Sequence, residues 1–253
     1  MMIRAEQMDA LRVFSDETFA VKATVRLRAL FPKHVAFMGD EALSGLLRTG
    51  IPRARNFGFR SERGIQTYLS LMVYFGTEFQ RDPQYTWILA LLEESPAAQQ
   101  EERARIDRII EATGEYSVAV AGPNREHVDR ALACLIDHGR MLIADPPRPI
   151  TLPSVQLLLT EVYPEKAGRL GEAGLTGLVQ NAHATARRHE LPGAEPVILF
   201  SVLSLLLGTF AAEDPQFAWI GQAISECRRQ LEPARLQHLL DRSFERLAAW
   251  AEK

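Results

Sequence analysis

One phrase of thirteen residues occurs twice in this chain, as GTEFQRDPQYTWI at 76–88 and as GTFAAEDPQFAWI at 208–220. The two copies lie 132 residues apart, and the same offset aligns the chain without a gap back to Pro32 and Pro164. Of these 57 aligned positions 15 are identical, against about 3 expected from ordinary residue usage. A repeated sequence folds into a repeated module. We therefore predict an internal duplication, with two homologous units packed as a pseudo-two-fold pair.

Each unit is predicted to be helical, so the expected fold class is all-α. Apolar residues recur near the helical period in 20–31 and in the aligned 154–163. Gly39 and the two acids after it predict a helix over 39–59, which Pro52 is expected to kink or split. Further helices are expected over 61–76, 82–94 and 101–112, and a buried core helix over 196–212.

The repeated phrase has the features of a joint between two helices. Gly76 ends a helix that Ser61 caps. Asp82 caps the next helix, Pro83 occupies its first position, and Trp87 faces inward. The residues between Gly76 and Asp82 differ in the second copy, whereas a catalytic loop used twice would keep its polar side chains. The pattern therefore favours a structural motif, made of Gly76, Asp82, Pro83, Trp87, Gly208, Asp214, Pro215 and Trp219.

The repeat divides the chain into a first helical unit (1–115), an unrepeated helix and linker (116–150) and a second helical unit (151–253). In the middle part, Asn124 is expected to cap a helix that runs to about His138. The sequences SVAVAG and MLIAD on either side of this helix leave open whether they form short strands. The C-terminal segment 232–252 is amphipathic and is expected to be a helix.

Composition and charge exclude several classes of partner. The net charge is -3, with 29 Lys and Arg against 32 Asp and Glu, which gives no bias toward nucleic acid or an anionic membrane. The longest uncharged run, 196–212, is shorter than the ~20 residues of a membrane span. The first residues carry no apolar signal core, and the two cysteines are far apart. We expect a cytoplasmic protein that binds neither nucleic acid nor membrane.

Signatures of known chemistry are absent from the sequence. It contains no P-loop, dinucleotide fingerprint, HExxH or nucleophile elbow. No two of the six histidines lie three or four residues apart, as a helical metal site requires. Cys134 is predicted to lie in the core, and the same is favoured for Cys227 over a reactive thiol. No catalytic residue, cofactor or metal ligand is therefore predicted.

Two arginine-rich elbows are the strongest candidates for binding. The segment 48–64 carries five arginines and one acid, and Arg55 aligns with Arg187 in the second copy. A patch for an acidic protein surface or a phosphate is one interpretation. The alternative is structural: Arg55 and Arg187 bridge helix C-termini or pair with Asp40 and Glu172. The candidate partner-binding residues are Arg53, Arg55, Arg60, Arg187 and Arg188.

The order of these motifs resembles a bacterial family of small helical proteins of unassigned mechanism. The shared pattern is Phe31-Pro32, a helix that begins Gly-Asp-Glu-Ala-Leu at 39–43, a short aromatic-rich helix that ends in Gly, and then Asp-Pro and Trp. Members of this family are often encoded beside type VI secretion spike, PAAR and toxin-effector genes. They carry one such unit, and this chain carries two, over roughly 15–95 and 147–227.

The resemblance implies a non-enzymatic accessory role. The first expectation is an effector-binding chaperone, co-chaperone or adaptor of a type VI secretion system, with a toxin effector or a spike component as its protein partner. The second is an immunity protein that neutralises a cognate toxin. A third alternative, from the residues alone, is an uncharacterised enzyme that uses the arginine-rich elbows.

Overall fold

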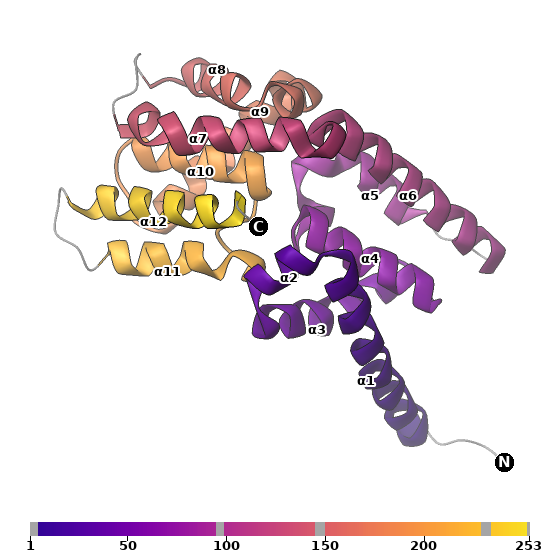
Figure 1. Cartoon of the computed structure of the whole chain (residues 1–253). Helices are drawn as coiled ribbons and strands as arrows, with labels where there is room; N and C mark the ends of the chain where they lie inside the picture. Colours follow the sequence, from indigo (N-terminus) through magenta and orange to yellow (C-terminus); the bar gives the residue numbers. More distant parts are fainter. Residues whose placement is uncertain (1–4, 95–98, 145–149, 229–233, 252–253) are drawn as a thin grey trace.

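The structure is a computed structural model that describes residues 5–94, 99–144, 150–228 and 234–251. In these ranges every regular element is a helix, which confirms the all-α prediction (Figure 1). The first half of the chain forms α1 (Ala5–Leu30), α2 (Pro32–Met38), α3 (Asp40–Asn56), α4 (Glu62–Phe75), η1 (Phe79–Arg81), η2 (Pro83–Tyr85), α5 (Thr86–Glu93) and α6 (Gln99–Ala121). The second half forms η3 (Pro123–Arg125), α7 (Glu126–Ala144), α8 (Leu152–Val162), α9 (Pro164–Arg188), α10 (Glu195–Leu207), η4 (Pro215–Phe217), α11 (Ala218–Cys227) and α12 (Ala234–Ala251).

Local capping follows the sequence. The Ser61 side chain accepts a hydrogen bond from the Gly64 N–H and begins α4. Gly76 ends this helix with φ of 103°, a conformation that residues with a side chain rarely adopt. The Asp82 carboxylate accepts from the Gln84 N–H, 2.9 Å away, and so caps the short turn η2 that leads into α5. These three predictions are confirmed.

The middle part of the chain differs from the prediction. Helix α6 continues to Ala121, through the expected boundary between residues 115 and 116, and neither flanking sequence forms a strand in its described part. Tyr116 and Val120 are buried whereas Val118 between them is 68% exposed, which fits a helix, because in a strand all three side chains would share one face. Asn124 caps no helix: it lies inside η3 with φ of 52°, and α7 begins after it and passes His138.

Pro52 does not split the helix that contains it. Helix α3 runs from Asp40 to Asn56 as one element with Pro52 inside it. Proline removes one backbone donor from the helix. In α3, the loss falls one turn before the C-terminus, where both neighbours of Pro52 on the core face, Ile51 and Ala54, remain buried.

Corresponding glycines have matching backbone conformations in the two halves. Gly39 has φ of 83° and ψ of 169°, and Gly171 has φ of 64° and ψ of 179°. Gly171 lies inside α9, so α9 covers the positions of both α2 and α3. Gly76 and Gly208 match as well, with φ of 103° and 107°. The chain therefore changes direction in the same way at residues 132 apart.

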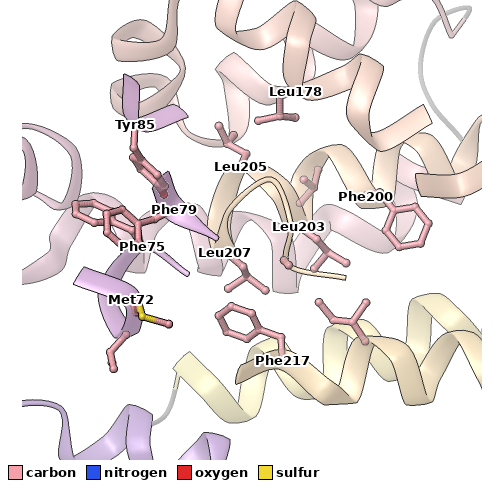
Figure 2. Close-up of a cluster of buried hydrophobic side chains, with 14 of the residues drawn as sticks. Met72, Phe75, Phe79, Tyr85, Leu178, Phe200, Leu203, Leu205, Leu207 and Phe217 are labelled. Carbon is pink, nitrogen blue, oxygen red and sulfur yellow. The ribbon is translucent and has the colours of Figure 1, made fainter. Parts of the chain in front are cut away.

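The two halves share one apolar core. Its centre brings together Met72, Phe75, Phe79 and Tyr85 from the first half with residues of α10 and η4 from the second (Figure 2). Leu203, Leu205, Leu207 and Phe217 lie in the same cluster, all buried. Because this apolar surface lies between the halves, separating them would expose it to water.

Helix α7 makes the second half different from the first. It packs against α8, α10 and α12, and Figure 1 shows it running alongside α10. Leu199 and Val202 of α10 are 0% and 1% exposed. The aligned residues of α4 are Thr67 and Ser70, which are half-buried. The extra neighbour explains why α10 is apolar on all sides whereas α4 has a polar face.

The apolar helix α10 has 13 residues. Among the helices that the structure describes, none combines the length and the apolar character needed to cross a membrane.

Because α7 covers α10 and no such helix covers α4 in the described part of the chain, exchanging aligned residues between α10 and α4 should change the free energy of unfolding more in α10. Leu199→Thr with Val202→Ser should lower the free energy of unfolding by about 4 kcal/mol, because it removes buried methyl groups and places hydroxyls in the core of the second half. The reverse exchange in α4, Thr67→Leu with Ser70→Val, should change it by less than about 1 kcal/mol. Urea unfolding of both variants tests this, and equal losses would contradict the role given to α7.

Candidate functional site

The repeated phrase forms the junction between the two halves. The Asp82 Oδ2 atom accepts a hydrogen bond from the backbone N–H of Thr209, 2.7 Å away. In the opposite direction, Asp214 Oδ2 accepts from the backbone N–H of Thr77, also at 2.7 Å. All four residues are buried. Each aspartate therefore caps the turn of its own half and binds the backbone of the other half.

Two glutamines repeat this exchange. Gln84 Nε2 donates to the Ser204 carbonyl, and Gln216 Nε2 donates to the Met72 carbonyl, both at 2.9 Å. Accordingly η2 packs against α9 of the second half, and η4 packs against α2 and α3 of the first. The sequence singled out the aspartates and missed the partners: Thr77, Thr209, Gln84 and Gln216 are identical in the two copies, and that identity was the available signal.

Burial controls the chemistry of the two aspartates. Desolvation raises the pKa of both carboxyls above the ordinary value, while their hydrogen bonds oppose this by favouring the ionised form. The glycines of the motif allow the close approach. A Cβ atom on Gly76 would lie 3.2 Å from Asp214 Oδ2, and one on Gly208 would lie 3.1 Å from the Phe75 carbonyl. The junction therefore requires glycine for space as well as for conformation.

A small recess opens at the junction. It is lined by both glycines, both aspartates and apolar side chains that include Phe79. The carboxylate oxygens that face it already accept hydrogen bonds from the Thr and Gln residues of the junction. The recess is thus part of the joint between the halves, because the carboxylate oxygens that line it already have hydrogen-bond donors.

The two halves differ beside the junction at His34 and its aligned residue Lys166. His34 Nε2 lies 2.9 Å from Gln216 Oε1, and the His34 ring meets the Phe217 ring edge-on. Lys166 is 4% exposed, and its Nζ donates to the Tyr85 hydroxyl at 3.3 Å. Desolvation lowers the pKa of Lys166 to about 8, partly opposed by the charge of Asp82. A buried amine of this kind destabilises the fold while it is protonated.

The two tryptophans of the motif are not equivalent. Trp219 is 7% exposed and faces the core, as predicted. Trp87 is half-buried and stacks on Tyr116 of α6, with ring centroids 5.3 Å apart. The inward-facing prediction is therefore correct for Trp219 and only partly so for Trp87. Pro83 and Pro215 each occupy the first position of a short helical turn, as predicted.

The arginine-rich elbows are engaged mainly within their own half. Arg53 donates to the Thr77 carbonyl at 2.9 Å and pairs with Glu78 at 2.6 Å, which holds the junction turn. In the second half, the Asn181 side chain donates to the corresponding carbonyl of Thr209, at 2.9 Å. Arg188 pairs with Glu213, and Arg60 donates to the Arg55 carbonyl at 2.9 Å. Arg187 has an exposed side chain.

The predicted ion pairs of the elbows are wrong. Asp40 pairs with Arg28 of α1, 2.6 Å away, and not with Arg55. Asp40 begins α3 and Arg55 lies near its end, and at 1.5 Å per residue this puts roughly 20 Å between them. Glu172 and Arg187 lie as far apart along α9 and do not pair either.

The structure does not bring the two elbows together. The C-terminal ends of α4 and α10 meet at the junction, where Gly208 approaches the Phe75 carbonyl. Each elbow lies at the other end of its helix, which has 14 residues in α4 and 13 in α10. In Figure 1 these helices extend to opposite sides of the junction. The elbows are therefore two separate basic sites and not one combined patch.

Residues that would hold a metal do not assemble in the described ranges, where no group of three or more His, Cys, Asp or Glu side chains lies close enough. Cys227 is buried and Cys134 is half-buried against the core, and neither is in a disulfide. Burial raises the pKa of the Cys134 thiol. Comparison with known proteins found no matching family model, no matching curated protein and no matching solved structure.

Because Asp82 and Asp214 stabilise the same junction, their contributions to the free energy of unfolding should not be additive. Asp82→Ala and Asp214→Ala should each lower the free energy of unfolding by about 3 kcal/mol, because each leaves a buried Thr N–H of the other half without an acceptor. The double variant should lose less than the sum, since both residues stabilise one junction. Thr151→Ala, at an exposed cap of α8, is the control and should cost about 1 kcal/mol. Additive losses in chemical denaturation would contradict a common junction.

Lys166 predicts a dependence of stability on pH. Between pH 8 and pH 10.5 the unfolded chain holds the proton of this lysine and the folded chain does not, so stability rises with pH in this window. The fall in pKa from 10.5 to about 8 corresponds to about 3 kcal/mol. Lys166→Met should therefore be more stable at pH 7, and the gain should shrink toward pH 10. Thermal unfolding at several pH values measures the difference, and a gain that does not vary with pH would contradict the assignment.

Proposed function

We propose that the protein is an internally duplicated, non-enzymatic accessory protein that binds another protein. The reciprocal contacts of the junction support a pseudo-two-fold pair of homologous units: residues 132 apart make the same hydrogen bonds in opposite directions. The identical polar residues of the repeated phrase are used in joining the units, so binding falls to other surfaces. In this proposal the outer faces of the two units contact the partner.

Apolar side chains exposed at aligned positions carry the proposal. Val25 of α1 is 64% exposed, and the aligned Leu157 of α8 is 44% exposed. Val21, one turn before Val25 on the same face, is 68% exposed. The N-terminal part of α1 extends away from the rest of the molecule (Figure 1). Exposed apolar residues that recur on one face of a helix are typical of a protein-binding surface.

The class of partner follows from the family resemblance. We propose a toxin effector or a spike component of a type VI secretion system, held by this protein before loading. The exposed Arg60 and Arg187 lie in the two elbows and would add attraction for acidic groups of such a partner. Neutralisation of a cognate toxin is the second role compatible with such a surface.

Affinity purification of the tagged chain from its native cells tests the proposal. A toxin effector or spike component is expected in stoichiometric amount, and Val25→Glu with Leu157→Glu should reduce its recovery at least tenfold, because the charges prevent burial of both positions. Val118→Glu is the matched control: this residue of α6 is 68% exposed and lies outside the surface. If the double variant is folded and recovers as much partner as the unchanged chain, the proposed contact of Val25 and Leu157 with the partner is refuted.

Two further measurements on the same system test the role of the elbows and distinguish a chaperone from an immunity protein. Arg55→Ala with Arg187→Ala should weaken capture more than it lowers the melting temperature if the elbows add attraction. Expression of this chain alone together with the captured toxin then separates the roles, since only an immunity protein rescues a poisoned cell. A chain recovered without any partner would refute the accessory class altogether.

A further inference from the structure

The turn between α6 and α7 is the covalent link between two bodies. Residues up to Ala121 belong to the first, and α7 packs with α8, α10 and α12 in the second. Between them Gly122, Asn124 and Arg125 have φ of 75°, 52° and 68°. Positive φ at residues other than glycine costs on the order of 1 kcal/mol each. This turn is therefore short and strained.

The contacts between the two bodies are all noncovalent. They include the exchanged Asp–Thr bonds, the Gln84 and Gln216 bonds, and the bond from Lys166 to Tyr85. The Tyr163 hydroxyl also donates to the Val120 carbonyl at 3.1 Å. A second copy of the chain presents the same groups in the same geometry. Each body is thus complementary to the other body of any copy.

We propose that the protein forms a domain-swapped dimer in which the Gly122–Arg125 turn opens and the first body of each copy pairs with the second body of the other. Short strained hinges favour such an exchange, and swapping uses contacts that the monomer already has. Both junctions re-form with all of their buried hydrogen bonds. The dimer interface is the surface on each side of the recess between Gly76 and Gly208.

Only contacts local to the turn are lost on opening. They include the bond from the Arg125 N–H to the Gly122 carbonyl, at 3.2 Å, the contact of His127 Nδ1 with the Val120 carbonyl, at 3.3 Å, and the packing of the Arg125 guanidinium over the Trp250 ring. The strain at Asn124 and Arg125 is released in return. Association costs entropy, so the monomer dominates in dilute solution and the dimer grows with concentration. Exchange is slow because the buried junction must separate first.

Straightening the turn tests the proposal. Gly122→Ala with Pro123→Ala replaces the two residues of the turn that most disfavour a helix and should join α6 to α7. In the closed form a Cβ on Gly122 would lie 2.8 Å from the His127 ring, so this variant also disfavours the closed turn. Light scattering after size exclusion should show the mass moving from 28.4 kDa to twice that value. Gly114→Ala, in α6 with open space around it, is the control and should stay monomeric.

The opposite variant relieves the strain without opening the turn. Asn124→Gly with Arg125→Gly should lower the dimer fraction of the chain refolded at high concentration at least threefold relative to the unchanged chain. An isolated swapped dimer should also persist for hours after dilution, whereas a dimer held by surface contact redistributes at once. A straightened variant that is monomeric at every concentration overturns the proposal. If that variant does not fold, an equal dimer fraction in the glycine variant and the unchanged chain overturns it.

Discussion

The structure depends on two buried carboxylates, each of which completes the half of the molecule to which it does not belong. Asp82 binds the Thr209 N–H, and Asp214 binds the Thr77 N–H. A buried N–H without an acceptor is costly, and so is a buried carboxylate without donors. Neither half is therefore satisfied alone. The glycines beside the threonines follow from the same requirement, because they leave room for the carboxylate and the backbone to meet.

Around this fixed centre the two halves differ in their contacts. The carbonyl of the junction threonine is held by Arg53 in one half and by Asn181 in the other. His34 and Lys166 occupy aligned positions with different partners. The geometry of the turn constrains only its caps and its exchanged bonds, so other contacts are free to change. This explains why the identical residues are concentrated in the repeated phrase, at 76–88 and 208–220.

Helix α7 is the main departure from symmetry and links the architecture to the proposed behaviour. It covers α10, which is accordingly apolar on all sides, and it attaches the second half to the first through the strained turn after Ala121. The outer faces of α1 and α8 are not covered in this way, and they carry the exposed apolar residues on which the proposed partner binding rests. The surfaces that join the two halves are thus different from the surfaces proposed to bind a partner protein.

The sequence by itself determined the elements whose signals are local: the all-α class, the caps Ser61 and Asp82, the helix end at Gly76 and the buried character of α10. It left open whether SVAVAG and MLIAD form strands, because apolar residues two and four positions apart fit a strand as well as a helix, and it missed that Asn124 caps no helix and that α3 continues through Pro52. The pairs of Arg55 with Asp40 and of Arg187 with Glu172 failed because a whole helix separates the two residues of each pair. Only the tertiary structure decided that the capping aspartates also bind the opposite half, since that contact joins residues 127 and 137 positions apart and no local pattern encodes it.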